Sequence, residues 1–186
     1  MPAKGEKMKT KSVVFAGVSL AIAFALSYVK LFRFPWGGSV TLCSMLFVSI
    51  IGWFFGPAVG MYSALIYGII QFFQGGSYVL NPLQVCLDYF AAFSALGVSG
   101  FFKDKKNGLL IGYLIGIALR GALHAIGGYL YWMDYMPEEF PKSLTAVYPI
   151  VYNYAYILGE GIITVFVISV PAVKKALDRV QQMATS

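Results

Sequence analysis

A run of 54 residues without a charged side chain, from Phe34 to Leu87, restricts this chain more than any other feature. A helix needs about 20 mostly apolar residues to cross a bilayer, because the hydrocarbon core is ~30 Å thick and a helix rises ~1.5 Å per residue. The run is long enough for more than two crossings, and a second uncharged run, Ser12–Val29, is long enough for one. Only 12% of the residues are charged, against about 25% in soluble domains, so an ordinary soluble domain is excluded.

Glycine and proline divide the apolar runs into helices. Gly56-Pro57 is typical of a helix end followed by a helix start, and Asn81-Pro82 is typical of an N-cap followed by a first-turn proline. The sequence therefore predicts an all-α integral membrane protein with six transmembrane helices in a single domain. The first helix is Ser12–Val29, the second and third share the long run, and the last three are Pro82–Phe102, Leu109–Trp132 and Pro149–Val173.

Lysine and arginine predict the orientation, because cytoplasmic loops of membrane proteins carry an excess of both. Three basic clusters fall on one side of a six-helix bundle: a tail at 1–11, a loop at 103–106 and a second tail at 174–186. We therefore predict that both termini are cytoplasmic and that residues 12–173 form the bundle. The first helix also has the basic start of a signal peptide, but its length and the spans that follow favour a retained helix.

Several function classes are not supported by any motif. The chain has no GxxxxGK[ST], no GxGxxG and a single histidine, so we expect no nucleotide site, no metal and no cofactor. Its net charge of +6 lies in short clusters and not on a continuous basic face, which argues against nucleic-acid binding. Cys43 and Cys86 each lie in an apolar run without metal-ligand or disulfide spacing, and both are expected to be buried.

Ionisable residues inside the predicted helices are the strongest functional signal. A charge near the bilayer centre costs ~2.5–3.5 kcal/mol on insertion scales, so such a residue usually faces a partner, a water-filled cavity or a ligand. Counted from the predicted helix ends at ~1.5 Å per residue, Asp88, His124 and Asn153 lie at one level in the outer half. Arg120 and Glu160 reach a similar depth from the inner ends, and we predict that they form an ion pair.

That ion pair would leave Asp88 as an unpaired carboxylate beneath a rim of aromatic side chains. Aromatic faces attract cations by about 0.5–2 kcal/mol each and stack on planar heterocycles. The pattern therefore predicts a site for a cationic heterocycle. The alternatives are that the aromatic residues form an interfacial belt and that Asp88 and His124 pair helices. The rim residues are Trp36, Tyr89, Trp132, Tyr148 and Tyr152.

Small residues recur at every fourth position in two helices. Gly17, Ala21 and Ala25 form such a stripe in the first helix, and glycines 108, 112 and 116 form one in the fifth. This spacing lets helices approach closely in lipid. Internal packing explains the glycines of the fifth helix, whereas the stripe in the first helix is equally suited to docking another protein.

Several short strings follow one another in order along the chain: Trp36-Gly37-Gly38-Ser39-Val40, Leu87-Asp88-Tyr89, Ala95-Leu96-Gly97-Val98-Ser99-Gly100, Leu119-Arg120 with His124 and Gly128, and Tyr148 with Asn153. This ordered set resembles the thiamine-specific substrate-capture subunits (ThiT, also called YuaJ) of energy-coupling-factor vitamin transporters. The resemblance covers nearly the whole chain.

The resemblance implies a non-enzymatic subunit in a prokaryotic cell membrane that binds thiamine from outside, in the outer half of a six-helix bundle. It implies partners that hydrolyse ATP: a transmembrane coupling subunit with two cytoplasmic ATPases. It also implies that Gly17, Ala21 and Ala25 form the docking face for the coupling subunit.

By motif position, Asp88 faces the aminopyrimidine and the thiazolium of thiamine, Tyr89 follows it, and Arg120 takes the place of a basic residue. Trp132 would stack on the cationic ring, and Glu160 has no counterpart. The resemblance assigns pyrimidine contacts to His124, Tyr148 and Asn153. It assigns a further aromatic contact to Trp36. Two other functions stay open here: a sibling subunit for another small heterocycle, and an intramembrane enzyme with Asp88 and His124 as acid and base.

Overall fold

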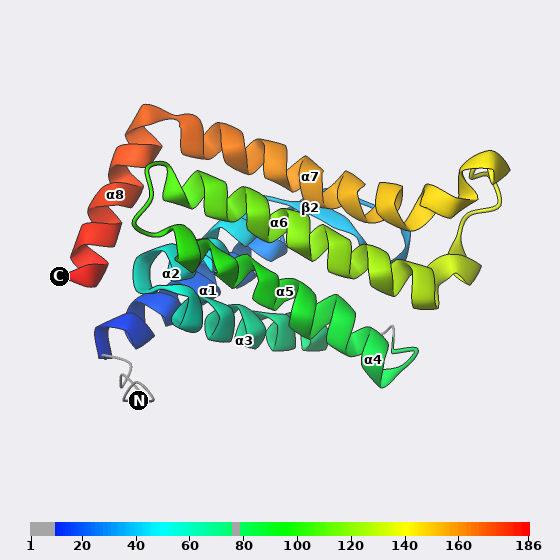
Figure 1. Ribbon diagram of the computed structural model, residues 1–186, viewed down its shortest axis with the longest axis horizontal. Coiled ribbons are helices and arrows are strands. Elements are labelled where there is room, and N and C mark those ends of the chain that lie inside the picture. Colours follow the sequence, from blue (N-terminus) through cyan, green and yellow to red (C-terminus); the bar gives the residue numbers. More distant parts are fainter. Residues whose placement is uncertain (1–9, 76–78) are drawn as a thin grey trace.

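The computed structural model describes residues 10–75 and 79–186, except for the side chain of Trp36. Within these residues the chain forms a bundle of long helices, and its first and last described residues lie at the same end (Figure 1). Residues 1–9 of the predicted basic tail lie outside the described residues. The elements are α1 (Thr10–Ser27), β1 (Lys30–Arg33), η1 (Pro35–Gly37), β2 (Ser39–Thr41), α2 (Ser44–Phe55), α3 (Pro57–Gly75), α4 (Pro82–Val85), η2 (Cys86–Ala91), α5 (Ala92–Ser94), η3 (Ala95–Phe102), α6 (Gly108–Gly127), η4 (Gly128–Trp132), η5 (Met133–Tyr135), η6 (Lys142–Val147), α7 (Tyr148–Ser169) and α8 (Pro171–Thr185).

The helix boundaries follow from glycine and proline. Gly56 ends α2 with a φ of +91°, a conformation that favours glycine, and α3 starts at the next residue. Asn81 caps α4 by accepting a hydrogen bond from the Leu83 N–H at 2.8 Å. Both predicted boundaries are confirmed. The predicted end of the sixth helix at Val173 is wrong, because Pro171 forces its predecessor into an extended conformation and starts α8.

Length and composition make four helices of the described part able to cross a membrane: Thr10–Ser27, Pro82–Phe102, Gly108–Tyr135 and Lys142–Ser169. The predicted helical character of the chain is confirmed. With 12 residues, α2 is only about 18 Å long, which is shorter than the hydrocarbon core.

A β-hairpin that the sequence analysis did not predict joins α1 to α2. Its strands β1 and β2 pair antiparallel, with a register irregularity between Lys30 and Phe32. Tyr152 of α7 fixes the connection between the strands, since its hydroxyl donates to the Pro35 carbonyl and accepts from the Gly38 N–H at 3.2 Å. The hairpin therefore lies against α7 and closes one side of the bundle.

The helix that covers residues 82–102 changes its geometry along its length. Its η2 part is a π-helix, which is wider than an α-helix, and its η3 part is a 3-10 helix, which is narrower. The narrow part touches the backbone of α3: a Cβ on Gly97 would lie 2.3 Å from the carbonyl carbon of Gly60. Likewise, a Cβ on Gly100 would lie 2.3 Å from that of Gly56. One end of this helix is thus sealed by backbone contact.

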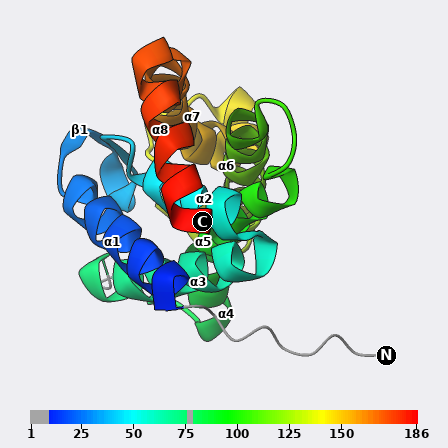
Figure 2. The same ribbon diagram turned by 90° about the vertical axis from the view of Figure 1, so that its left-hand side faces the viewer.

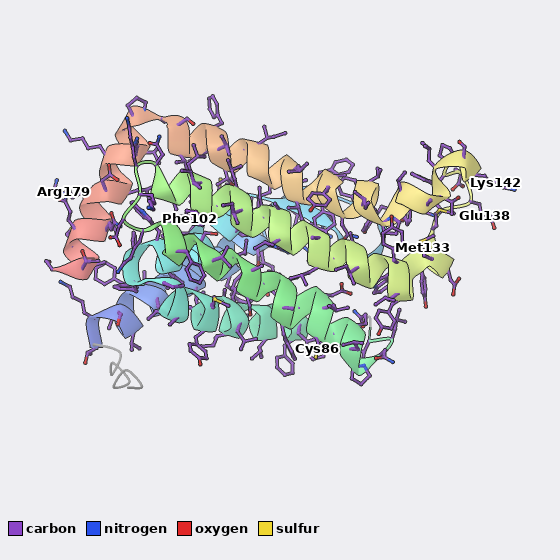
Figure 3. The ribbon with its side chains drawn as sticks, in the orientation of Figure 1. Cys86, Phe102, Met133, Glu138, Lys142 and Arg179 are labelled. Atoms are coloured by element: carbon purple, nitrogen blue, oxygen red, sulfur yellow. The ribbon has the colours of Figure 1, made fainter. Side chains whose placement is uncertain are left out.

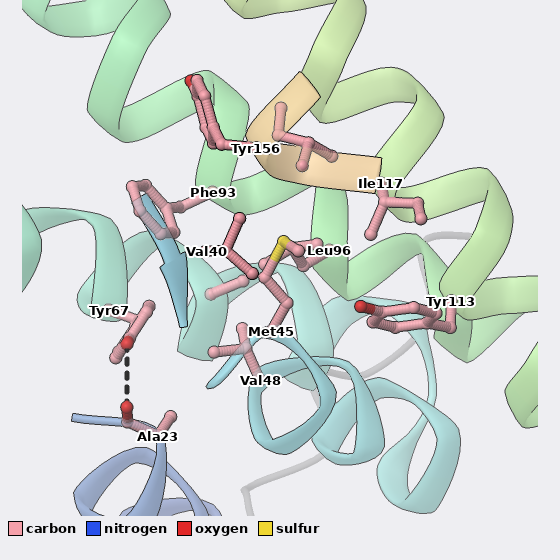
Figure 4. Packing of buried hydrophobic residues seen from close by; sticks show 12 residues of the cluster. Ala23, Val40, Met45, Val48, Tyr67, Phe93, Leu96, Tyr113, Ile117 and Tyr156 are labelled. Atoms are coloured by element: carbon pink, nitrogen blue, oxygen red, sulfur yellow. Dashed lines mark hydrogen bonds between the residues drawn. The ribbon is translucent and has the colours of Figure 1, made fainter. Parts of the chain in front are cut away.

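Buried apolar side chains fill the middle of the bundle (Figure 4). Met45 and Val48 of α2 belong to the same buried cluster as Leu96 of η3 and Ile117 of α6. The Tyr67 hydroxyl donates to the Ala23 carbonyl at 3.1 Å and ties α3 to α1. Beyond this core, toward η2 and η4, the bundle contains a cavity.

The two cysteines lie in different environments. Cys43 is buried at the start of α2, as expected. The expectation that Cys86 is buried is wrong: its side chain is exposed on the outside of the bundle (Figure 3). An apolar run cannot show which face of a membrane helix points outward, because lipid accepts apolar residues as readily as a core does.

Candidate ligand-binding site

A cavity of about 370 Å³ lies at the end of the bundle that contains η2, η4 and the hairpin. This volume is within the range of small-molecule sites. The side chain of Trp36, also predicted for the site, lies outside the described residues. The structure brings the other seven predicted site residues together, and all of them line the cavity: Asp88, Tyr89, Arg120, His124, Trp132, Tyr148 and Asn153.

The Asp88 carboxylate lies at the centre of the polar part of the cavity and is 12% exposed. Its Oδ2 accepts hydrogen bonds from Gln84 Nε2 at 2.7 Å and from Trp132 Nε1 at 3.0 Å. Its Oδ1 lies 3.3 Å from Nδ1 of His124. Among the described residues, no lysine or arginine forms an ion pair with it. The carboxylate is therefore held by N–H donors without a fixed cation beside it.

Two π-helical segments and a glycine create the space around this carboxylate. Asp88 belongs to η2, and Trp132 belongs to η4. Single π turns inside α-helices occur frequently at functional sites. A Cβ on Gly127 would lie 2.7 Å from Asp88 Oδ1, so a side chain at this position would displace the carboxylate.

Arg120 supports the site from behind His124. Its Nε donates to His124 Nε2 at 3.4 Å, and its guanidinium carbon lies 4.1 Å from the centre of the Phe93 ring. A nitrogen that accepts from arginine carries no proton, so His124 is the neutral tautomer with its proton on Nδ1, which faces Asp88. Arg120 thus orients the histidine and does not touch the carboxylate.

The predicted ion pair between Arg120 and Glu160 is wrong. Glu160 is 3% exposed, and its Oε1 accepts from the Met45 N–H at 2.8 Å and from Ser44 Oγ at 3.2 Å. Its Oε2 accepts from the N–H of Thr41 at 3.3 Å and from the hydroxyl of the same residue. Counting depth brought the two charges to one level, but depth does not determine which neighbour each side chain faces.

Glu160 instead caps α2 from another helix. The N-cap residue of α2, Cys43, has a left-handed φ of 57° and makes no side-chain cap bond. The first N–H groups of a helix need acceptors and favour a negative charge. Glu160 supplies both from α7, and it lines the cavity at the same time.

The side chain of Asn153 uses almost all of its hydrogen-bonding capacity within the protein. Its Nδ2 donates to the Pro149 carbonyl at 2.8 Å and to the His124 carbonyl at 3.2 Å. Its Oδ1 accepts from the Tyr156 hydroxyl at 2.8 Å. Both amide hydrogens are therefore used, and one lone pair on Oδ1 remains for a ligand. This arrangement suits the acceptance of a hydrogen bond from an exocyclic amine and not donation to a ring nitrogen.

Tyrosines at every fourth position of α7 form the aromatic wall. The ring centres of Tyr148 and Tyr152 are 5.8 Å apart, and those of Tyr152 and Tyr156 are also 5.8 Å apart. Trp132 packs against Tyr135 on the other side, with ring centres 5.3 Å apart. These rings belong to residues that line the cavity, so an aromatic surface surrounds the polar centre.

Sequence reasoning missed several lining residues. Gln84 lies four residues before Asp88, and Tyr156 lies four residues after Tyr152, so helical spacing could have found both. Gln71 and Gln74 of α3 had no such signal, since only the tertiary structure brings them to the cavity. The lining residues that were not predicted include Gln84, Phe93, Tyr156, Glu160, Gln71 and Gln74.

The small-residue stripe of α1 faces away from the bundle. Gly17, Ala21 and Ala25 are exposed, whereas Ala16 and Ala23 on the other side of the helix are buried. A Cβ on Gly17 would meet no atom within 4 Å. The stripe is therefore not used for packing within the described part of the chain.

Membrane-capable helices and a cavity with a carboxylate among aromatic rings define a membrane protein that binds a small molecule. More specifically, the chain belongs to the thiamine transporter protein family (Thia_YuaJ), whose model matches residues 13–179. It is thus a transport protein and not an enzyme, and the family resemblance of the sequence is confirmed.

Known relatives agree with this assignment. The chain is 31% identical to the thiamine transporter ThiT of Bacillus subtilis over 147 residues, which are 72% of this chain and 74% of the relative. It is 24% identical to ThiT of Lacticaseibacillus paracasei over 178 residues, which are 85% of each protein. A solved structure of ThiT from Listeria monocytogenes has the same fold, with a TM-score of 0.72 at 24% identity, and the match covers 88% of this chain and 93% of that chain.

Proposed function

We propose that this chain is the thiamine-capturing subunit of an ATP-driven energy-coupling-factor importer in a prokaryotic cell membrane. The observation that carries the proposal is the Asp88 carboxylate. It is held by N–H donors inside an aromatic cavity, and no lysine or arginine of residues 10–75 and 79–186 forms an ion pair with it. Thiamine offers a permanent positive charge on its thiazolium and an exocyclic amine on its pyrimidine. These two groups complement the carboxylate and the aromatic faces.

The polar side chains suggest how the two rings are distinguished. The remaining lone pair of Asn153 Oδ1 can accept a hydrogen bond from the exocyclic amine. This hydrogen bond would also bring the pyrimidine close to His124 and Tyr148. The thiazolium then lies beside Asp88 and the faces of Trp132 and Tyr89. In this pose the positive ring replaces water next to a carboxylate that the protein has already oriented.

The distribution of charge supports a cytoplasmic position for both termini and entry of thiamine from outside. Three lysines follow the helix 82–102, and α8 contains Lys174, Lys175 and Arg179. Arg179 lies at one end of the bundle, whereas Glu138 and Lys142 lie at the other, beyond the cavity (Figure 3). The proposed six membrane segments are α1, α2, α3, residues 82–102, residues 108–135 and α7, with α2 as a short segment beneath the hairpin.

The partners we propose are a transmembrane coupling subunit and two cytoplasmic ATPases. Support comes from the outward-facing stripe of Gly17, Ala21 and Ala25 on α1, where small side chains leave the backbone open to close approach. Removal of this surface by larger side chains, such as Ala21→Leu, should prevent transport in the full complex while thiamine binding by the isolated subunit stays unchanged.

The decisive experiment is a fluorescence titration of the purified protein with thiamine, because Trp132 lines the cavity. Asp88→Asn keeps the size of the side chain and removes its charge, so we expect affinity to fall by about 100-fold or more, as is usual when one partner of a buried charge pair is removed. Asp104→Asn is the matched control, since Asp104 is exposed at the opposite end.

Competition identifies the ligand class. Pyrithiamine should displace thiamine, and riboflavin should not. An absence of any thiamine response in the parent protein, or equal affinities for the parent and Asp88→Asn, would refute the proposal. Displacement by riboflavin alone would assign the chain to a different heterocycle.

A further inference from the structure

A second cavity, of about 400 Å³, lies at the end of the bundle opposite the thiamine site. It is a groove between the turn at 103–107, the ends of α6 and α7, and α8. Its floor is apolar and includes Trp53, Leu109, Ile168 and Leu177. We call it the inner groove.

Three lysines surround the inner groove. Lys103 and Lys105 come from the turn, and Lys174 comes from α8. Among the described residues, Asp178 is the one acidic residue in the lining. Lysine stems can cover apolar surface while their ammonium groups stay at the polar boundary. An apolar floor under a net positive rim is complementary to a molecule with a negative head and an apolar body.

The groove is held in shape by α8. Lys174 Nζ donates to Asn107 Oδ1 at 3.0 Å, and Gln181 Nε2 donates to the Trp53 carbonyl at 3.1 Å. The first contact fixes α8 to the turn, and the second fixes it to α2. Helix α8 therefore runs across the end of the bundle, roughly perpendicular to the long helices (Figures 1 and 2). This is the orientation of a helix that lies in a membrane interface.

The surroundings of the groove are apolar on the side of the long helices. Phe101, two residues before Lys103, is 62% exposed, and Val170, which follows the end of α7, is 37% exposed. A free anion would use the lysines but leave this apolar wall uncovered. An amphiphile uses both, because its head meets the lysines and its chains follow the outer surface of the helices.

We propose that the inner groove binds the phosphate headgroup of an anionic phospholipid. The phosphate lies between Lys103, Lys105 and Lys174, and the glycerol backbone with the start of the acyl chains covers Leu109 and Ile168. The bound lipid anchors α8 in the interface and fixes the depth of the bundle in the membrane. This site is separate from the thiamine cavity and does not depend on thiamine recognition.

The test is native mass spectrometry of the full chain after extraction from bilayers that contain equal amounts of phosphatidylglycerol and phosphatidylcholine. The parent protein should retain phosphatidylglycerol preferentially. Lys103→Gln/Lys105→Gln/Lys174→Gln should reduce its retention by at least tenfold, since each lysine near a membrane surface contributes to binding of anionic lipid. The corresponding arginine triple variant should restore it.

The matched control removes the same charge from the same end of the molecule, outside the groove. Lys106→Gln/Lys175→Gln/Arg179→Gln should keep the bound lipid. Equal losses in both triple variants, or equal retention of the two lipids by the parent, would overturn the proposal. Equal thermal stabilisation by inorganic phosphate in lipid-free detergent would also overturn it in favour of a free anion. Circular dichroism of every variant shows that it is folded.

Discussion

The two halves of the helix 82–102 differ in width and in what they contact. The η2 half is widened to a π-helix, and its Asp88 side chain lines the cavity. The η3 half is tightened to a 3-10 helix and brings Gly97 and Gly100 against neighbouring backbone. Eight residues of continuous 3-10 helix are uncommon, because hydrogen-bond geometry in this form is poorer. In this helix, a segment sealed by backbone contact and a segment that lines a cavity thus differ in helical width and follow one another directly.

A second carboxylate of the bundle, Glu160, differs from Asp88 in its partners. Asp88 is held by side chains and faces the cavity, so it is available to a ligand. Each oxygen of Glu160 already accepts two hydrogen bonds, and the donors include the backbone N–H of Thr41 at the end of β2 and that of Met45 at the start of α2. These partners support our proposal that the two carboxylates serve two purposes, binding for Asp88 and support for Glu160.

The largest expected effect is on stability, from Gly97→Ala in the sealed half. The added methyl would overlap the backbone of α3, which cannot move as a flexible side chain can, so we expect a loss of about 3 kcal/mol in the free energy of unfolding. Thermal unfolding in detergent measures it. Gly17→Ala is the control, because its methyl meets open space and should stabilise α1 by about 0.5–1 kcal/mol. If Gly97→Ala unfolds like the parent, the backbone contact is not tight.

Glu160→Gln should lower the free energy of unfolding by about 2 kcal/mol, because hydrogen bonds to a charged acceptor contribute about 1.5–3 kcal/mol and an amide offers only one acceptor oxygen. Hydrogen exchange should accelerate at residues 39–45, where the cap is lost. Asp104→Asn should leave both properties unchanged. If Glu160→Gln loses thiamine affinity as strongly as Asp88→Asn while hydrogen exchange stays unchanged, Glu160 contacts the ligand and does not cap α2.

Gly127→Ala tests the same substitution beside the widened half, because Gly127 of α6 lies against Asp88 of η2. Here the methyl meets the Asp88 carboxylate, a side chain that can rotate away, so the fold should tolerate it. We expect the affinity for thiamine to fall about tenfold, equivalent to about 1.5 kcal/mol for an off-rotamer carboxylate. Calorimetric titration measures the affinity, and unfolding measures the fold. The opposite pattern would be an unchanged affinity for thiamine with a lower free energy of unfolding. It would remove the distinction between the two halves.

The smallest expected effect comes from Trp132→Phe. This change keeps an aromatic ring but removes the Nε1–H that donates to Asp88, so affinity should fall about fivefold, or about 1 kcal/mol for one hydrogen bond. Trp53→Phe, at the other end of the bundle, should leave thiamine affinity unchanged. Equal effects of both substitutions would mean that Trp132 acts on the fold and not on the carboxylate.

Part of the site could be predicted because helices have a regular rise. Counting turns placed Asp88, His124 and Asn153 at one depth, and the structure joins all three through hydrogen bonds. The same counting failed for Arg120 and Glu160, because depth leaves the rotation of each helix undetermined. Arg120 instead turns toward His124 and Phe93.

Other features left no trace in the pattern of residues. The hairpin lies inside the long uncharged run, where apolar strand residues and apolar helix residues look alike. The 3-10 part of the helix lies against glycines 56 and 60 of other segments, which meet η3 only after folding. Gln71 and Gln74 likewise meet the other lining residues of the cavity only after folding.

The sequence alone determined that the chain is a helical membrane protein with polar groups inside its helices. Transfer from water to lipid is approximately a sum over residues, so composition along the chain is sufficient to reveal it. Only the tertiary structure decided which polar groups meet, where the cavity opens and which carboxylate faces it. Those properties depend on helix rotation and on distances of closest approach, which arise between segments far apart in the chain.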